Sequence, residues 1–216
     1  LYLPMLAVTW LAPKSAADRL QAPPSLREAV WEPFVGFLSK RRALELLAFV
    51  VLYKLADNLG GALIRPFLVQ TGFNDFDVGI ATATIGLIAT LIGTFLGGML
   101  TTAMGLGHAL WVFGALQIAS NLGYVLIAEV GVNRPLMYAA MGFESLTTGM
   151  GTGAFSVLLL RMTMKQFSAT QYALFSSLFA LPRILAGPVT GVMVDAVGWR
   201  DFFLFTIAIG IPGMLM

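Results

Sequence analysis

Long apolar runs, separated by short polar turns, recur from residue 43 to the end of the 216-residue chain. A helix that crosses the hydrocarbon core of a bilayer needs about 20 predominantly apolar residues. Charged residues make up only 11% of the chain, against about a quarter in soluble domains. The predicted fold class is therefore all-α, a polytopic membrane protein. The predicted spans are about 43–67, 78–101, 107–129, 134–160, 170–195 and, truncated, 201–216.

The first 42 residues differ from the rest of the chain. Residues 1–12 are apolar and are predicted to be the end of a preceding transmembrane helix, so we expect the chain to be part of a longer protein. Residues 13–42 carry six Lys/Arg and three Asp/Glu and are predicted to be a linker. Ser25 and Glu28 have the spacing of a capping box, which predicts an amphipathic helix, either solvated or lying on lipid headgroups. Residues 43–216 form the predicted transmembrane bundle.

The distribution of Lys and Arg predicts the orientation. Cytoplasmic loops of membrane proteins carry an excess of these residues. The linker is basic, and Arg161 and Lys165 fall on the same side of the predicted bundle, whereas Asp75 and Asp77 lie in a loop on the opposite side. We therefore expect the linker to be cytoplasmic.

Several classes of site are missing from the sequence. There is no cysteine and one histidine, His108, so neither a disulfide framework nor a histidine-based metal site is predicted, and no cofactor is expected. No GxxxxGK[ST], GxSxG or HExxH pattern occurs, which disfavours an ATP-driven pump and the common hydrolases. The net charge of +2 is small, and no nucleic-acid partner is expected. Membrane lipid is the expected partner of the predicted transmembrane bundle.

Lys54, Asp57 and Asn58 interrupt the first predicted span. Lys54 lies twelve residues beyond Arg42, which places it roughly 18 Å into the bilayer at 1.5 Å per residue. The spacings of three and four residues put all three side chains on one helix face. Charges at such depth are costly and usually face a wet cavity or one another. The group is either a neutralised pair that holds the bundle together or the wall of a polar cavity for a solute or a proton.

Glu144 and Arg183 bring charge to the middle of two further spans. Glu144 lies roughly 15 Å from one face of the bilayer, and Arg183 roughly 18 Å. Burial favours the protonated form of a glutamate, which suits a proton carrier. Arg183 offers a planar fork of donors, which suits a carboxylate or phosphate of a substrate or a salt bridge to Glu144. Both interpretations of Arg183 remain open at this point.

The segment 142-GFESLTTGMGTGAF-155 combines Glu144 with two hydroxyls, Thr147 and Thr148, and three alternate glycines. The glycines permit either close helix packing or the close approach of a substrate. In 93-GTFLGG-98 the G-x-x-x-G spacing predicts a packing surface between helices. Gln117 and Asn121, one turn apart, are predicted to form hydrogen bonds between helices rather than to bind a ligand.

Several ordered motifs resemble a known family. They are 25-SLREAVWEPFVGFLSKR-41, 53-YKLADNLGGALIRPFLVQTGF-73, 142-GFESLTTGMGTGAF-155 and 168-SATQYALFSSLFALPRILAGPVTGVMVDAVGW-199. Together they resemble the AmpG-like muropeptide permeases of the major facilitator superfamily, and in part the related acetyl-CoA transporter branch. The turn 97-GGMLTTAMGLGHAL-110 resembles the loop signature of that superfamily, although its acidic and basic positions are replaced.

The resemblance implies a C-terminal six-helix half of a twelve-span transporter, whose N-terminal half would complete the cavity. It implies proton-driven import of N-acetylglucosaminyl-1,6-anhydro-N-acetylmuramyl peptides across the bacterial inner membrane for cell-wall recycling. In that interpretation the side chains that bind substrate are Lys54, Asp57, Asn58, Glu144, Thr147, Thr148 and Arg183. Glu144 is preferred over Asp57 for proton coupling, because Lys54 should hold Asp57 ionised.

Three alternatives remain open from the sequence. A transporter of the same fold could carry another organic anion, such as an acyl-CoA. An intramembrane enzyme would use Glu144 and Asp57 in catalysis, but the sequence offers no metal-binding histidine set or paired aspartate motif. A structural membrane protein would explain the glycines but not the charges at midplane depth.

Overall fold

The computed structural model describes residues 31, 35, 39, 42–162 and 168–215. Within the described helices, the side chains of Lys54, Asp57 and Arg183 are among those left undescribed. The predicted stub at 1–12 and nearly all of the predicted linker at 13–42 also lie outside the described residues. Every element in the described ranges is helical: α3 Ala43–Thr71, α4 Asp75–Gly79, the π-helix η3 Ile80–Gly86, α5 Leu87–Met104, α6 Leu106–Val130, α7 Arg134–Met162 and α8 Ser168–Leu215.

The helix ends follow local chemistry. Asn74 precedes α4, and its side-chain oxygen accepts a hydrogen bond from the backbone N–H of Asp77 at 2.7 Å, as an N-cap does. α4, η3 and α5 then run on as one helical rod over the predicted span 78–101 and beyond it at both ends. α8 covers both of the last predicted spans, and its backbone leaves the helical region at Gly198 (φ 79°, ψ 167°). This is a conformation that glycine adopts far more readily than other residues.

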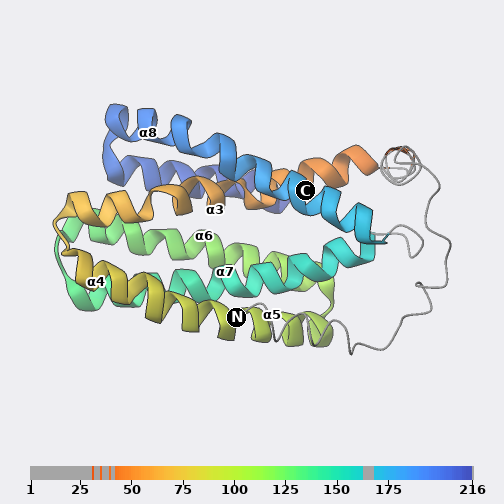
Figure 1. Cartoon of the computed structure of the whole chain (residues 1–216), viewed down its shortest axis with the longest axis horizontal. Helices are drawn as coiled ribbons and strands as arrows, with labels where there is room; N and C mark the ends of the chain where they lie inside the picture. The colour runs from red at the N-terminus through yellow and green to blue at the C-terminus, as the bar shows by residue number, and fades with distance from the viewer. Residues whose placement is uncertain (1–30, 32–34, 36–38, 40–41, 163–167, 216) are drawn as a thin grey trace, which may run out of the picture.

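The helices lie side by side along the long axis of the molecule (Figure 1). α3 packs against α8, and α5 packs against α7, while α6 contacts both α7 and α8. The α3–α4 turn, the α6–α7 turn and the break at Gly198 lie at one end of the bundle, and the α5–α6 turn lies toward the other end. The bundle therefore consists of two helix pairs joined through α6.

The surface and composition fit a lipid environment. Two of the described helices, Asp75–Met104 and Leu106–Val130, are long and apolar enough to cross a membrane. Large apolar side chains are exposed along α5, including Leu91 at 63% and Phe95 at 70%. A continuous apolar face of this kind is unusual in a soluble monomer and normal against lipid. α7 is more polar because it carries Glu144, several hydroxyls and many glycines.

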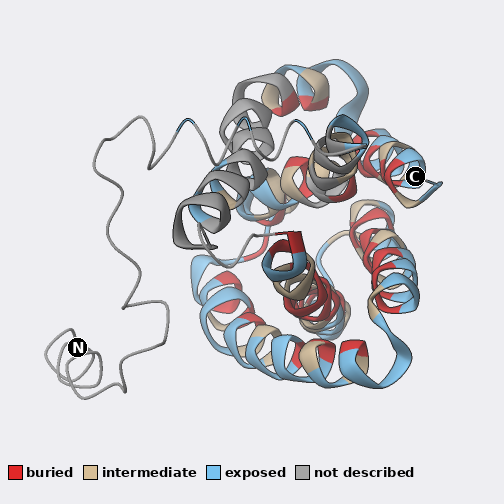
Figure 2. Ribbon diagram, turned by 90° about the vertical axis from the view of Figure 1, so that its right-hand side faces the viewer, coloured by how far each residue is buried: buried red, intermediate tan, exposed pale blue. Residues whose placement is uncertain are grey.

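Buried residues lie on the sides of the helices that face one another (Figure 2). The apolar residues among them form two clusters. We name each after one member. The Phe67 cluster consists of Phe67, Leu68, Phe73, Val78, Ala81, Tyr124, Val125, Ile127, Met137, Ala140, Met141, Val194, Phe202 and Phe203. The Tyr53 cluster consists of Tyr53, Ala109, Leu110, Phe113, Met150, Ala154, Phe155, Leu159 and Met162. Because α3, α6 and α7 contribute to both clusters, the two hold the same helices at separate heights.

Glycines set the distance between α5 and α7. A Cβ built at Gly97 would lie 2.6 Å from the Cα of Met150, and one at Gly153 would lie 2.7 Å from the backbone oxygen of Thr94. Side chains larger than hydrogen would therefore collide with backbone on either helix. The predicted packing surface at 93-GTFLGG-98 is confirmed, and Gly153 on α7 packs in the same way.

Candidate functional site

A polar layer separates the two apolar clusters. On α6, Gln117 and Asn121 come after Phe113 of the Tyr53 cluster and before Tyr124 of the Phe67 cluster. On α7, residues 144–148 come after Met141 of the Phe67 cluster and before Met150 of the Tyr53 cluster. On α3, Asn58 lies between Tyr53 and Phe67. The same order on three packed helices places these polar side chains at one level of the bundle.

Glu144 is joined to α6 through one threonine. The Thr148 hydroxyl donates to Oε1 of Glu144 at 3.1 Å. The Nε2 of Gln117 in turn donates to Oγ1 of Thr148 at 2.9 Å. The carboxylate, the hydroxyl and the amide therefore form a hydrogen-bonded chain from α7 to α6. The prediction that Gln117 bonds to another helix is confirmed.

Thr147 lies on a different face of α7 from Thr148. Its side chain is completely buried, and its hydroxyl donates to the backbone oxygen of Glu144 at 2.9 Å. Such a bond satisfies the hydroxyl within its own helix. A substrate contact of Thr147 therefore stays a prediction, whereas Thr148 is brought directly to the Glu144 carboxylate.

Asn58 presents an unsatisfied donor in the polar layer. Its Nδ2 atom is buried and has no hydrogen-bond partner among the described residues. A buried amide without a partner costs about 1–3 kcal/mol. This cost is offset when a solute or a water molecule supplies the missing acceptor, which is consistent with the predicted substrate role of Asn58.

The positions of the other predicted charges follow from the backbone alone. Lys54 and Asp57 lie on α3, and Arg183 lies on α8. α3 and α8 pack against each other. Two predictions stay open for Arg183, a salt bridge to Glu144 and a contact with a substrate. The grouping of Lys54 with Asp57 on one helix face also stays a prediction.

A π-helical segment lies against α7 beside Glu144. A Cβ at Gly86, the last residue of η3, would lie 3.2 Å from the hydroxyl oxygen of Ser145. A Cβ at Gly142 would lie 3.3 Å from Cγ2 of Ile85. π-helical turns are rare and are frequent at functional sites. No sequence signal predicted η3, because helical hydropathy does not distinguish an i→i+5 from an i→i+4 hydrogen-bond pattern.

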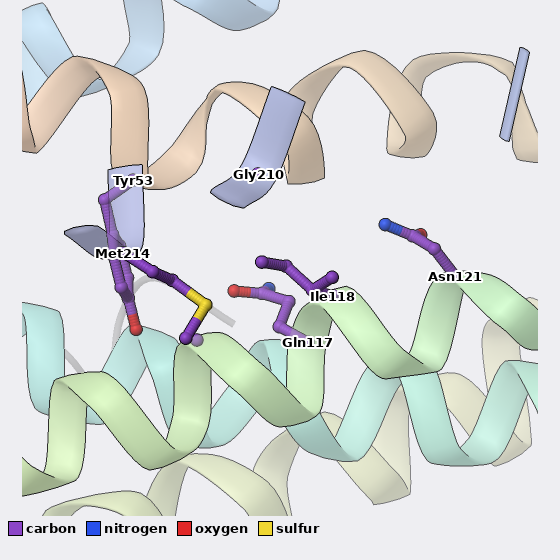
Figure 3. Close-up of a pocket in the computed structure, with 7 residues that line it drawn as sticks. Tyr53, Gln117, Ile118, Asn121, Gly210 and Met214 are labelled. Carbon is purple, nitrogen blue, oxygen red and sulfur yellow. The ribbon is translucent and has the colours of Figure 1, made fainter. Parts of the chain in front are cut away.

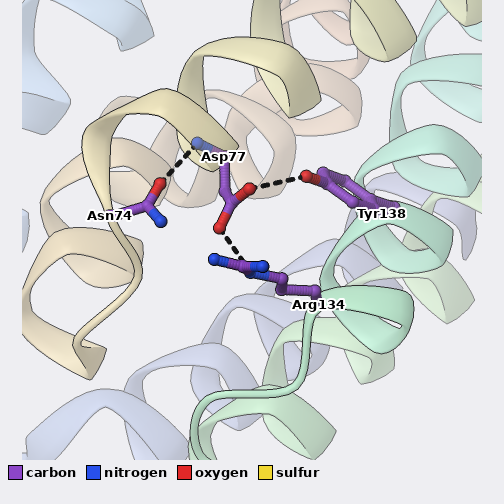
Figure 4. A network of polar contacts seen from close by, with 4 residues as sticks. All are labelled: Asn74, Asp77, Arg134 and Tyr138. Atoms are coloured by element: carbon purple, nitrogen blue, oxygen red, sulfur yellow. Dashed lines mark hydrogen bonds and ion pairs between the residues drawn. The ribbon is translucent and has the colours of Figure 1, made fainter.

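A second polar group lies at the end of the bundle that holds the α6–α7 turn (Figure 4). Asp77 is only 7% exposed. Its Oδ2 lies 2.6 Å from Nε of Arg134, and its Oδ1 accepts a hydrogen bond from the Tyr138 hydroxyl at 3.0 Å. These contacts tie the start of the α4–η3–α5 rod to the start of α7. All of the partners come from the protein itself, so this group is best explained as a structural clamp.

Further polar contacts close the same end between α3, α6 and α8. The indole Nε1 of Trp199 donates to Oε1 of Gln70 at 2.9 Å, and Nε of Arg200 donates to Oε1 of Glu129 at 2.8 Å. Trp199 also packs against Phe67 and Phe203. The break at Gly198 is therefore anchored to both neighbouring helices.

Comparison with known proteins gives consistent relatives over the whole chain. The chain is 42% identical to a protein of Escherichia coli K12 named anhydromuropeptide permease, over 217 aligned positions that cover 100% of this chain and 44% of the relative. It is 33% identical to a Rickettsia prowazekii protein named as an AmpG transporter, with 85% of the chain and 43% of the relative covered.

A third relative, an uncharacterized protein of Haemophilus influenzae, is 31% identical over 95% of the chain and 51% of its own length. The chain thus spans about half the length of the curated relatives it matches. No protein-family model matches the chain.

Proposed function

Because the chain belongs to the AmpG-like muropeptide permease family, we propose that it forms the C-terminal half of a secondary active transporter that imports anhydromuropeptides. The Escherichia coli relative carries that substrate in its name. The two-half architecture of major facilitator transporters places substrate sites near the bilayer midplane. In this proposal the transporter lies in the bacterial inner membrane with the linker 13–42 in the cytoplasm, and the missing N-terminal half supplies the facing wall of the cavity.

The observation that carries the proposal is the polar layer around Glu144. Membrane interiors tolerate a carboxylate only where partners or water compensate its charge. The chain from Glu144 through Thr148 to Gln117 supplies such partners on two helices. The unsatisfied amide of Asn58 provides a donor at the same level. A glycopeptide offers many hydroxyl and carbonyl groups, which are the acceptors that such donors require.

Within this proposal Glu144 is the proton carrier. A carrier must bind a proton on one side of the membrane and release it on the other. The Thr148 hydroxyl can donate to the ionised carboxylate and accept from the protonated one, so it serves both states. Asp57 is the second choice. Lys54 and Arg183 bind the anionic parts of the substrate in this proposal.

Uptake by the intact transporter in membrane vesicles tests the proposal. The substrate is a labelled anhydromuropeptide, and each variant is measured with and without a proton gradient. We expect Glu144→Gln to lose gradient-driven accumulation while it retains exchange of substrate across the membrane. Glu45→Gln is the matched control, because Glu45 has a 66% exposed side chain in an ion pair with Arg42 at the start of α3.

Each outcome has a distinct meaning. Parental accumulation by Glu144→Gln would exclude Glu144 as the carrier and leave Asp57. Failure of the parent to take up anhydromuropeptides, together with uptake of an acyl-CoA or another organic anion, would replace the substrate class. Uptake that does not respond to the proton gradient would refute coupling to protons.

A further inference from the structure

A small cavity lies between α3, α6 and α8, and Gln117 is one of the side chains that line it (Figure 3). Tyr53 of α3, Gln117 and Asn121 of α6, and Gly210 and Met214 of α8 line it. The space open to the centre of a water-sized sphere is about 10 Å³. A volume of about 10–15 Å³ on this measure is what one water molecule requires.

Asn121 needs a partner in this cavity. The residue is 6% exposed, and its amide projects from α6 toward the gap between α3 and α8 (Figure 3). Among the described residues its side chain has no hydrogen-bond partner. Across the interface, a Cβ at Gly60 of α3 would lie 3.7 Å from Oδ1 of Asn121. Gly60 itself therefore offers Asn121 no side chain to bond to.

Gln117 brings a second amide to the same cavity. It is also 6% exposed and lies one helical turn before Asn121, so both amides are on one face of α6. An amide side chain can form up to four hydrogen bonds, so Gln117 can bind Thr148 and a further group at once. Dry cavities in proteins are lined by apolar groups, and a site with two amides is not of that kind.

We propose that this cavity binds one ordered water molecule, held by the side-chain amides of Asn121 and Gln117. The water gives Asn121 a partner that the described side chains do not supply. It also extends the hydrogen-bond chain of Glu144, Thr148 and Gln117 from α7 through α6 to the interface with α3 and α8. Glycine at position 114 keeps the space open, because a Cβ there would lie 3.0 Å from Cε2 of Tyr53.

The water site goes beyond the transport proposal, since it requires neither substrate nor a proton gradient. Its test is a structure of the intact transporter at a resolution that shows ordered internal waters. We expect a density peak within about 2.7–3.2 Å of both amides, the range of a hydrogen bond. Asn121→Leu, which replaces the amide with an apolar group of similar size, should lose the peak. Leu122→Ala, at a 49% exposed position on the same helix, should retain it.

Two results would overturn the inference. One is a parent structure that shows other internal waters but no peak at this position. The other is a peak that persists in Asn121→Leu, because the amide would then not hold the water.

A measurement on the parent alone decides the matter if Asn121→Leu does not fold. The transfer of magnetisation from water to the side-chain amide of Asn121 should exceed the transfer to the backbone amide of Leu68. Leu68 is completely buried in the Phe67 cluster. Equal transfer would refute the bound water. Neither experiment depends on uptake, so the water site and the transport activity can fail separately.

Discussion

Replacing Gly97 with alanine should push α5 away from α7, whereas the same change at the neighbouring Gly98 should be tolerated. A Cβ at Gly97 would lie 2.6 Å from Cα and 2.9 Å from the carbonyl carbon of Met150. These are backbone atoms, which cannot move aside by a change of rotamer. A Cβ at Gly98 would meet nothing within 4 Å. The two variants therefore add the same methyl group to the same helix with opposite consequences.

The magnitude follows from the required movement. Ordinary contacts of a Cβ begin at 3.4 Å, so the two helices must separate locally by roughly 1 Å, and a gap of that size forfeits about a quarter to a half of each dispersion contact. Overpacking of this kind typically costs about 1–3 kcal/mol. Both variants gain the same helix propensity, up to about 1 kcal/mol, so this gain cancels when they are compared. We expect Gly97→Ala to be less stable than Gly98→Ala by the overpacking cost alone, about 1–3 kcal/mol.

The assay is equilibrium unfolding of the intact transporter in a fixed detergent, with parent and both variants measured side by side. The close contacts at Gly97 predict a lower free energy of unfolding for Gly97→Ala and an equal or higher one for Gly98→Ala. If Gly97→Ala is as stable as Gly98→Ala, the glycines do not set the α5–α7 distance, and the packing argument is wrong.

Three further predictions concern the ends of the bundle. An impermeant thiol reagent should label Val132→Cys from the periplasm and His108→Cys from the cytoplasm, as the Lys/Arg distribution predicts. These 216 residues contain no cysteine of their own that would add a background signal. The reverse labelling pattern would invert the proposed orientation. Asp77→Ala should lower the free energy of unfolding by about 1–3 kcal/mol, because the Arg134 side chain and the Tyr138 hydroxyl lose their acceptor. Asp77→Asn should lower the free energy of unfolding by less, because the amide keeps one acceptor oxygen. Gly198→Ala should cost about 1–3 kcal/mol through its backbone conformation alone, and unchanged unfolding would contradict the observed break.

The helix positions depend on features that the sequence displays directly. The predicted span 107–129 lies within α6, which extends one residue further at each end. Gly105 and Gly131, with φ values of 83° and 78°, flank that helix. An apolar run bounded by glycines can be recognised in the sequence, because the hydropathy of the run and the flanking glycines are both local signals. The G-x-x-x-G surface on α5 was predictable for the same reason.

The partners across the bundle were not predictable. The pairing of Asp77 with Arg134 and Tyr138 joins residues from two helices, whereas the sequence shows only that Asp77 and Arg134 are charged and lie near predicted loops. Gln117 was predicted to bond to another helix, but its partner Thr148 and the resulting link to Glu144 depend on the rotation of α6 against α7. Rotation about a helix axis is set by side-chain packing and close glycine contacts rather than by hydropathy.

The position of the polar layer follows from how helices associate in lipid. Lipid tails are as apolar as leucine, so helix pairs are held by close packing and by hydrogen bonds rather than by the hydrophobic effect. Close packing is supplied above and below the layer by the Phe67 and Tyr53 clusters, which involve the same three helices. The cost of placing Glu144, Gln117 and Asn121 between them is then limited to satisfying their polar atoms. Because both clusters pack α3, α6 and α7 without those polar atoms, we expect the proposed transporter to rearrange the layer around a solute while the clusters keep the helices together.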